Sequence, residues 1–425
     1  MARFFYSCMF CLLMPLMFFR MWWRGRLAPA YRLRWGERLG LVPQRVGARG
    51  AIWVHSVSVG ETIAALPMIE ALLASYPDKD IIVTTTTPTG SDRVNASLGG
   101  RVIHAYAPYD LPLCLDQFIR RLRPDMLIIM ETELWPNTIH ACAVSDIPVV
   151  VANARLSHKS AQGYDKFSSL TRSMLEEVSM VAAQHESDGQ RFLDLGLPRD
   201  RLVVTGSIKF DLTVNEQDVQ RAQQFRRRWL ASGERPVFLA ASTHEGEDAK
   251  VLDAFTELLS HHMNLLLVLV PRHPERFDKV AHLVSEYGLT YQRHSTAQDV
   301  AATSQVLLGD TMGEMMPMLG ASDIVFMGGS WVNVGGHNLI EPAAWGKPII
   351  SGPSLFNFAE VSRLLLAQNA LWVADNPRDC SDHINRLLDS SEVAVAMGSA
   401  AKDVADANRG ALQKLLDQID QQLAR

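Results

Sequence analysis

Cysteine is scarce in this sequence, and its positions form no framework. Five cysteines are scattered over 425 residues, an odd number without regular spacing, so the chain lacks the disulfide scaffold of small secreted domains. The one C-x-x-C pair, Cys8 and Cys11, lies in an apolar segment with no second pair. We therefore expect reduced domains that fold around a hydrophobic core, as in the cytosol.

Several cofactor motifs are missing as well. The sequence contains neither a G-x-G-x-x-G dinucleotide fingerprint nor a Walker lysine, which removes support for NAD and ATP chemistry. His244-Glu245 lacks the second histidine of a zinc-binding helix. Asp78-Lys-Asp80 precedes its strand in a Pro-Asp turn, where a solvated loop is the better interpretation. We expect no metal site and no cofactor, and the net charge of −5 argues against nucleic-acid binding.

An apolar segment is present at the amino end. Residues 4–19 are apolar apart from Ser7, and Met21-Trp22-Trp23 follow a single arginine. This is near the lower limit for a membrane-spanning helix, roughly 17–25 residues. Arginines cluster after the segment, which by the positive-inside rule leaves the downstream chain in the cytoplasm. We predict an uncleaved membrane anchor over residues 1–24, and the alternative is a helix that lies in the membrane interface.

From Gly50 onward, short β-rich runs alternate with helical patterns, which is typical of parallel, doubly wound sheets. We predict an α/β fold with two tandem Rossmann-like domains that face a cleft. The N-terminal domain is expected over 25–212, an interdomain linker over 213–234, and the C-terminal domain over 235–425, closed by one long helix at 392–423. The strands are expected at residues 52–55, 81–85, 102–105, 126–130, 149–152, 178–182, 203–205, 237–241, 265–270, 305–308, 324–327, 348–350 and 371–373.

Polar residues follow the predicted strands of the first domain. One such turn is His55-Ser-Val-Ser-Val-Gly-Glu61, between an apolar run and a helical pattern. Open α/β sheets bind ligands at the carboxyl ends of their strands, so Glu61 is placed to act as a base in a crevice. The alternative is a glutamate at a helix start, where the helix dipole favours it by ~0.3–1 kcal/mol.

Two further turns carry charged side chains. Glu131-Thr-Glu133 follows the apolar residues 126–130, and two carboxylates there are costly unless they face a polar cleft. The alternative is that one of them caps the helix predicted to begin near Pro136. Gly206-Ser-Ile-Lys209 also follows a strand. Lys209 is a candidate to neutralise a phosphate, and a solvated surface lysine is the alternative.

The second domain has comparable turns. Pro271-Arg272 follows a very apolar run, which places Arg272 at a strand end for phosphate recognition. Gly335-Gly336-His-Asn338 precedes a helical pattern, and backbone amides in such a turn can cradle an anion. Glu341, one turn further on, is a candidate to accept hydrogen bonds from a ribose.

Together these motifs closely resemble the Kdo (3-deoxy-D-manno-octulosonic acid) transferases of lipopolysaccharide synthesis. The resemblance covers nearly the whole chain and includes the apolar start. One departure is Ile340-Glu341-Pro342, where many relatives carry Leu-Glu-Ala. The matching motifs are Arg-Trp-Gly-Glu-Arg at 34–38, the turns at 55–61, 130–137 and 206–211, Pro-Arg-His-Pro-Glu-Arg-Phe at 271–277, Gly-Asp-Thr-Met-Gly-Glu at 309–314 and Gly-Gly-His-Asn at 335–338.

The resemblance implies an inverting glycosyltransferase of the two-Rossmann-domain (GT-B) architecture, held on the cytoplasmic face of a Gram-negative inner membrane. Its donor would be CMP-Kdo and its acceptor the tetraacylated lipid A precursor lipid IVA, among inner-membrane lipids. The family's general base corresponds to Glu61, and its transition-state residues correspond to Glu131 and Lys209. The residues that the resemblance assigns to CMP binding are Pro271, Arg272, Met312, Gly313, Glu314, Asn338, Leu339, Ile340 and Glu341.

Two other functions fit parts of the pattern. A GT-B-shaped sugar-nucleotide epimerase would use the same nucleotide cradle but needs no lipid acceptor, so the apolar start counts against it. A non-catalytic, membrane-anchored sugar-binding protein would not need Glu61, Glu131 and Lys209 together. Because the leaving group carries one phosphate, which protein groups can neutralise, we expect transfer without Mg²⁺.

Overall fold

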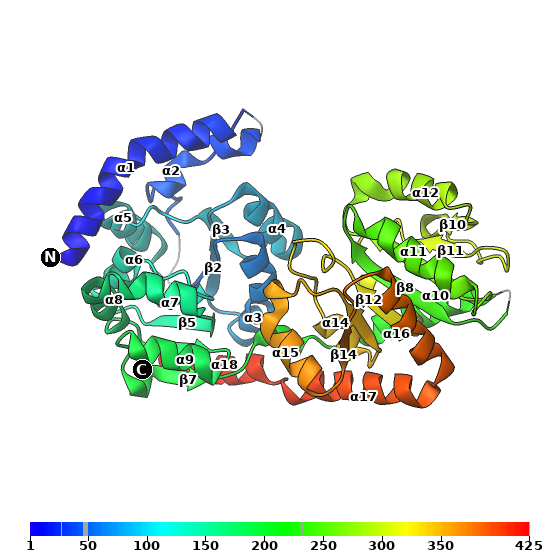
Figure 1. Cartoon of the computed structure of the whole chain (residues 1–425). Coiled ribbons are helices and arrows are strands. Elements are labelled where there is room, and N and C mark those ends of the chain that lie inside the picture. The colour runs from blue at the N-terminus through cyan, green and yellow to red at the C-terminus, as the bar shows by residue number, and fades with distance from the viewer. Residues whose placement is uncertain (27, 46–49, 232, 425) are drawn as a thin grey trace. The chain divides into compact units, whose positions relative to one another are not determined.

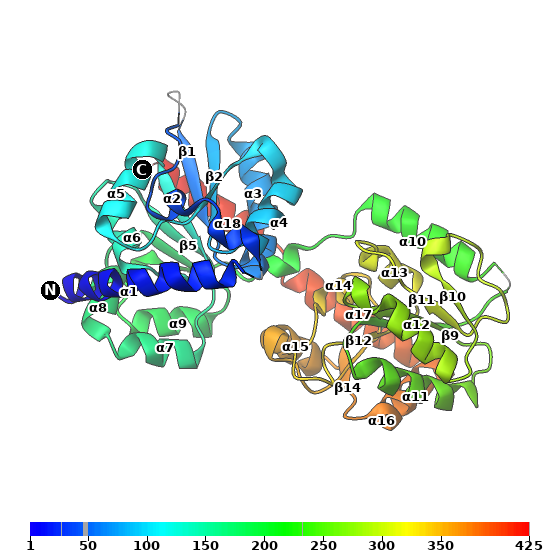
Figure 2. The ribbon, with the colours of Figure 1, turned by 90° about the horizontal axis from the view of Figure 1, so that it is seen from above.

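The structure of the chain is a computed structural model, and it describes residues 1–26, 28–45, 50–231 and 233–424. The chain divides into two compact units (Figures 1 and 2). The first consists of residues 1–211 together with the chain end from residue 409, and the second of residues 212–408. Each unit has its own seven-stranded parallel sheet with helices on both faces, so both units are Rossmann-like.

The first sheet has the strand order β3-β2-β1-β4-β5-β6-β7. Its strands are apolar runs because helices cover both faces. Alternate residues of β1 point to opposite cores: Trp53 packs with Phe118, and Val54 packs with Met68. The strands are β1 (Ala51–His55), β2 (Asp80–Thr85), β3 (Ile103–Tyr106), β4 (Met126–Met130), β5 (Val149–Ala154), β6 (Met180–Ala183) and β7 (Leu202–Val204). The helices are α1 (Ala2–Arg24), α2 (Trp35–Arg38), α3 (Val59–Ser75), α4 (Pro88–Leu98), α5 (Pro112–Leu122), α6 (Pro136–Ala143), α7 (His158–Asp165), α8 (Ser168–Leu175), α9 (Glu186–Asp194) and α18 (Ala411–Leu423).

The second sheet has the order β10-β11-β9-β8-β12-β13-β14. Leu267 and Leu269 of the strand Leu266–Pro271 pack with Phe238, Phe255 and Phe326 in one core. The strands are β8 (Val237–Thr243), β9 (Leu266–Pro271), β10 (Tyr291–Arg293), β11 (Val306–Leu308), β12 (Ile324–Met327), β13 (Ile349–Ser351) and β14 (Leu371–Val373). The helices are α10 (Glu216–Trp229), α11 (Glu247–Leu259), α12 (Phe277–Glu286), α13 (Met315–Ala321), α14 (Ile340–Ala344), α15 (Ala359–Ala367), α16 (Pro377–Asp389) and α17 (Ser391–Ala407).

The apolar amino-terminal segment forms α1, which is long and apolar enough to cross a membrane by length and composition. One face of α1 packs against the first unit. Phe10 and Phe18 lie near the ring of Tyr109, at centroid distances of 6.1 and 5.6 Å, and the Tyr109 hydroxyl donates to Met21 Sδ at 3.3 Å. Tyr6 hydrogen-bonds to the buried Asp110 carboxylate. The helix is therefore attached along most of its length and is not an independent segment.

The observed units differ from the predicted domains at both ends of the second unit. The predicted linker contains α10, which belongs to the second unit and packs on α13. The predicted closing helix at 392–423 is two helices, α17 and α18, because Gly410 between them has a left-handed φ of 89°. The second of these belongs to the first unit, where Leu415 and Ile419 pack in the core of the first sheet. Its amino end is held by Asp211, whose carboxylate accepts from Gly410 N and Leu412 N.

The elements that were not predicted are short, and they include β10, α7 and α8. Strand β10 has only three residues, all partly exposed, at the edge of the second sheet. Helices α7 and α8 have eight residues each, and α7 buries none of them. Such elements lack the periodic apolar pattern on which prediction from sequence depends.

Candidate active site

The turn after β1 holds Glu61 in a fixed position. Ser58 is the N-cap of α3: its Oγ accepts from Glu61 N at 3.3 Å and donates to Glu61 Oε1 at 2.7 Å. The other oxygen, Glu61 Oε2, accepts from Val57 N at 2.8 Å. This reciprocal arrangement is a variant of the capping box. The interpretation of Glu61 as a helix-start residue is therefore confirmed, and the same contacts orient its carboxylate.

The environment of Glu61 also suits a base. Burial raises the pKa of its carboxyl group, against the lowering effect of the bonds from Val57 and Ser58. The carboxylates of Glu133 and Glu131 raise it further. A carboxylate with a raised pKa accepts a proton more readily, and each oxygen retains lone-pair capacity beyond the bond it accepts.

Glu131 and Glu133 follow β4 and have different partners. Glu131 adopts a left-handed φ of 57°, a conformation that costs a non-glycine residue free energy and is frequent at functional sites. Its Oε1 lies 3.5 Å from Lys209 Nζ. Glu133 accepts from Trp135 Nε1 at 3.1 Å, and burial raises its pKa. Neither glutamate caps α6, whose N-cap is Trp135 without a side-chain capping bond; that alternative is wrong.

Lys209 is positioned by a buried asparagine that the sequence reasoning missed. Asn153, near the end of β5, accepts from Ile208 N through its Oδ1 at 3.2 Å, and its own carbonyl accepts from Gln184 Nε2 at 2.9 Å. Asn153 is fully buried and has a left-handed φ of 52°. The signal in the sequence is a polar residue inside an apolar strand. It fixes the turn from which Lys209 reaches Glu131.

His55 forms a neutral support beneath these turns. Its Nδ1 lies 2.9 Å from Thr84 Oγ1, which also accepts from Trp53 Nε1 at 2.8 Å. Complete burial lowers the pKa of His55 to about 4, so its ring is uncharged at neutral pH. The Trp135 ring packs on it at a centroid distance of 4.8 Å. The turns after β1 and β4 are thus joined by packing.

In the second unit, a buried carboxylate organises two loops. Glu247, in the first turn of α11, is fully buried and accepts from His244 N at 2.9 Å. It also accepts from Gly329 N, Ser330 N and Trp331 N at 2.7, 2.9 and 2.8 Å. Glu247 therefore binds the glycine-rich turn after β12 to the loop after β8. The carboxylate that holds this turn was not among the candidates predicted from the sequence.

Three histidines and an arginine meet at these loops. His244 Nε2 lies 2.9 Å from His337 Nε2, and the His273 ring is 5.3 Å from that of His244. Burial is the main cause that lowers the pKa of His244, and it lowers that of His337 to about 4. The Arg272 charge contributes to both shifts. The predicted Arg272 therefore places a permanent positive charge beside two imidazoles, those of His244 and His337, that are uncharged at neutral pH.

The candidate residues Asn338 and Glu341 contact each other. Asn338 donates from Nδ2 to Glu341 Oε1 at 3.1 Å and accepts from Ile340 N at 3.1 Å. Burial raises the pKa of Glu341, while Asn338 and then Arg272 lower it. Helix α14 begins at Ile340 and not at Asn338, because the Asn338 side chain bonds Ile340 N from outside the helix.

The remaining predicted residues, Met312, Gly313 and Glu314, form a separate loop. Glu314 pairs with Arg221 of α10 and lies 3.4 Å from His294 Nε2. Met312 is 57% exposed. In the described part of the second unit, no hydrogen bond or ion pair joins Glu314 to Arg272 or Glu341.

Comparison with known proteins adds to this geometry. A family model described as 3-deoxy-D-manno-octulosonic-acid transferase (kdotransferase) matches residues 33–212, and one described as glycosyl transferases group 1 matches residues 237–404. A 3-deoxy-D-manno-octulosonic acid transferase of Haemophilus influenzae is 42% identical over 431 residues, covering 100% of both chains. The enzyme of the same name from Bordetella pertussis is 35% identical and covers 96% of each chain. A solved glycosyltransferase of Rickettsia africae, 15% identical, matches 89% of this chain and 99% of its own with a TM-score of 0.57, which shows a shared fold.

Proposed function

The chain belongs to the Kdo transferase family, and we propose that it transfers Kdo from CMP-Kdo to the lipid A precursor lipid IVA, with inversion and release of CMP. Its fold is of the GT-B type, and transfer of Kdo in lipopolysaccharide synthesis is the activity of the family. The observation that carries the finer proposal is one cluster at the carboxyl ends of the first sheet. There a buried Glu61 with a raised pKa lies near the Glu131–Lys209 ion pair.

In the proposed reaction, Glu61 removes the proton from an acceptor sugar hydroxyl. The hydroxyl oxygen forms a bond to the anomeric carbon of Kdo, the bond from that carbon to the phosphate oxygen breaks, and CMP departs with the electron pair. Lys209, held by Glu131, stabilises the negative charge of the transition state. Positioned general bases contribute about 10²–10⁴-fold to rates of this kind.

The CMP moiety is assigned to the second unit. Arg272 supplies a permanent positive charge for the phosphate, and the adjoining His244 and His337 are uncharged at neutral pH and so do not compete as cations. Asn338 and Glu341, already bonded to each other, supply polar contacts for the ribose. We further assign Pro271, Leu339, Ile340 and the loop from Met312 to Glu314 to the same nucleotide site.

We propose that transfer needs neither a metal ion nor a cofactor. Within the described residues, no group of three or more His, Cys, Asp or Glu side chains is arranged to hold a metal ion. The donor must be supplied preformed, since its synthesis can require Mg²⁺. Activity should then persist in excess EDTA; loss of transfer under EDTA that one divalent ion restores would overturn this part of the proposal.

The proposed location is the cytoplasmic side of the inner membrane of a Gram-negative bacterium, with α1 as the single anchor. Its outward face carries large apolar side chains such as Phe4, Leu12, Leu16 and Trp23, all exposed. Because the opposite face is bound to the first unit, only this outward face is free to enter lipid. That favours a helix lying in the membrane interface over the predicted span.

The test is an assay of the full-length protein in detergent with preformed CMP-Kdo and lipid IVA. We expect Kdo-modified lipid IVA and CMP in equal amounts. CMP release without a lipid product would refute the proposed acceptor. Conversion of the donor sugar to an epimer would favour the epimerase alternative, and donor binding without turnover would favour a non-catalytic sugar-binding protein.

A further inference from the structure

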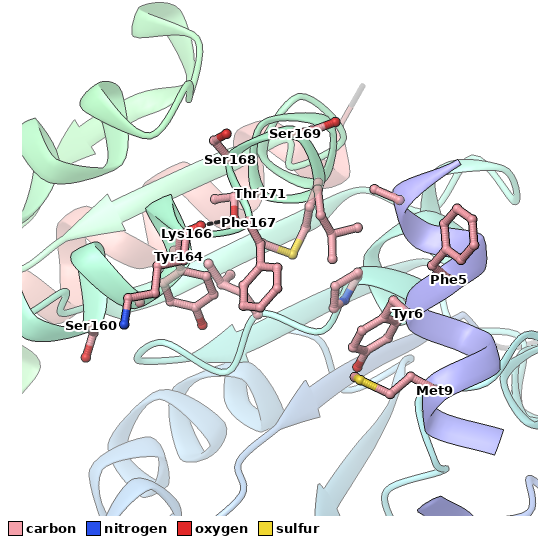
Figure 3. Close-up of a pocket in the computed structure, with 16 residues that line it drawn as sticks. Phe5, Tyr6, Met9, Ser160, Tyr164, Lys166, Phe167, Ser168, Ser169 and Thr171 are labelled. Atoms are coloured by element: carbon pink, nitrogen blue, oxygen red, sulfur yellow. Dashed lines mark hydrogen bonds between the residues drawn. The ribbon is translucent and has the colours of Figure 1, made fainter. Parts of the chain in front are cut away.

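A cavity of about 890 Å³ lies in the first unit between α1 and the α7–α8 pair. Figure 3 shows Phe5 and Met9 of α1 on one side, and Tyr164 and Phe167 on the other. Leu134 also lines the cavity, whose surface is mainly apolar. Small-molecule sites typically have volumes of about 300–1,000 Å³. The space therefore suits an apolar ligand of substantial length.

The cavity is continuous with the outward face of α1. Phe5 and Met9 line it and are at the same time 64% and 53% exposed. Further along the same helix, Leu12, Leu16 and Phe19 are exposed as well. A row of exposed apolar side chains of this size marks a surface that binds a membrane or a partner. If this face of α1 lies in lipid, as the proposed function requires, a ligand would reach the cavity from lipid without crossing water.

The other end of the cavity is formed by the turn that carries two glutamates of the site. Leu134 directly follows Glu133, and Tyr164 donates from its hydroxyl to Thr132 O at 3.1 Å. Burial and then the nearby Glu133 carboxylate raise the pKa of Tyr164 to about 12. Glu133 in turn acts on the pKa of Glu61. An apolar chain in the cavity would therefore bring its polar end to the catalytic carboxylates.

We propose that this cavity binds one fatty acyl chain of the acceptor lipid and thereby presents the acceptor sugar to Glu61, an inference that rests on the proposed function. The walls would also accept a chain of a bulk phospholipid. The turn that carries Glu131 and Glu133 also lines the cavity, and this favours the acceptor lipid over a bulk phospholipid. Only the acceptor has a polar end that must reach Glu61. Each buried methylene group improves binding by roughly fourfold, so an acyl chain contributes strongly to the KM of the acceptor.

Gly163 offers a way to fill the cavity without disturbing the fold. It lines the cavity from α7, and a Cβ atom placed on it meets nothing within 4 Å. Gly163→Phe should raise the KM for lipid IVA by about tenfold or more, equivalent to two lost methylene contacts. The KM for CMP-Kdo should not change. The assay uses the full-length protein in detergent micelles.

Gly100→Phe is the matched control, because Gly100 lies in the same unit, outside the cavity, with equally open space around its Cβ position. We expect wild-type kinetics from it. If the wild type transfers Kdo but Gly163→Phe has a wild-type KM for lipid IVA, the cavity does not bind the acceptor and the proposed function stands. If the wild type does not transfer Kdo at all, the proposed function itself fails.

A photo-crosslinking experiment tests the inference on the unmodified protein. A lipid IVA analogue with a diazirine on one acyl chain should label peptides within residues 2–9, 134–136 and 160–174, and excess lipid IVA should abolish the labelling. Excess phosphatidylethanolamine should not. Equal competition by phosphatidylethanolamine would assign the cavity to bulk lipid, and labelling confined to residues outside these three segments would show that the acyl chain binds elsewhere; either result overturns the proposal.

Discussion

Glu61 has both a structural role at the start of α3 and the proposed role of general base. Its carboxylate accepts from Val57 N and from the Ser58 hydroxyl, which fixes the beginning of α3. The same side chain is buried, and its pKa is raised by that burial and by neighbouring carboxylates. Structural and catalytic contributions can be separated only by a change that keeps the shape of the side chain.

Glu61→Gln is such a change. The amide keeps one acceptor oxygen for the helix start but cannot take a proton, so Kdo transfer should fall by about 10²–10⁴-fold. The KM for CMP-Kdo should remain close to that of the wild type. The measurement is initial-rate transfer with both substrates varied. Glu70→Gln, at an exposed position of the same helix where Glu70 pairs with Arg101, should retain full activity.

The pH profile gives a second readout for the same variant. Glu61 must be ionised to act as a base, so wild-type kcat/KM should fall as the pH drops through a pKa raised above the ordinary value of about 4.3. The residual activity of Glu61→Gln should lack this acidic limb. A near wild-type rate, or an unchanged acidic limb, would mean that the base has to be sought at Glu133.

Arg272→Ala tests donor recognition. Removing a charge-assisted contact to a phosphate costs about 1.5–3 kcal/mol, so the KM for CMP-Kdo should rise by roughly 10–100-fold with a smaller change in kcat. Arg363, on α15, pairs with Glu360 and is exposed, so Arg363→Ala should behave as the wild type. If Arg272→Ala lowers only kcat and leaves the KM for CMP-Kdo unchanged, Arg272 does not contribute to donor binding.

At the scale of elements, much of the fold could be predicted because buried parallel strands are continuous apolar runs. β1 and β4 are such runs, and the polar turns that follow them were recognised as site candidates on that basis. The resemblance gave Glu131 and Lys209 a shared role, but their pairing was not predicted, since 78 positions separate the two residues in the chain. The break between α17 and α18 at Gly410 was not predicted, because the helical spacing of apolar residues continues on both sides of it.

The residues that hold the turns could not be predicted from local patterns. Asn153 supports Ile208 and Glu247 supports Gly329, so each acts on a segment far away in the sequence. From the sequence alone, Asn153 is a polar interruption of a strand and Glu247 one of several acidic residues in a helix start. Their roles follow from parallel topology, which places the ends of distant strands side by side.

Glu247→Gln tests the support of the second unit's glycine-rich turn. The amide has one acceptor oxygen in place of two and directs an NH₂ group toward backbone N–H donors. The buried donors left unpaired should lower the free energy of unfolding by about 1–3 kcal/mol and raise the KM for CMP-Kdo. Denaturant unfolding and initial rates measure the two effects. Glu245→Gln, two residues earlier and exposed beside Lys279, should change neither.

At the scale of the whole molecule, the chain end belongs to the unit in which the chain begins. Leu415 and Ile419 of α18 are fully buried with β1 and α3 residues. The Tyr76 hydroxyl of the first unit also donates to Asp420. The second unit is thus an insertion within the first in terms of chain order, and damage to α18 should act on the first sheet.

Leu415→Ala makes this arrangement measurable. Truncation of a buried leucine typically costs 2–5 kcal/mol, and we expect that loss in the unfolding of the first unit. CMP binding, measured by calorimetry, should be unchanged because the assigned nucleotide residues belong to the second unit. Gln413→Ala, at an exposed position of α18, should leave both properties intact. Weakened CMP binding in Leu415→Ala would show that α18 also stabilises the second unit.

The placement of α18 also determines the order in which the protein is completed on the ribosome. Domains usually fold from the amino end as they emerge, while the chain grows by about 5–20 residues per second. Here the first unit requires the last helix to be translated, and the second unit must be synthesised in between, a delay on the order of 10–40 s. During that interval the nascent first sheet lacks the cover that Leu415 and Ile419 provide, beside a helix α1 already rich in exposed apolar side chains. The unit that is made first is therefore finished last, and its incomplete form is the species that nascent-chain chaperones and membrane-targeting factors would meet.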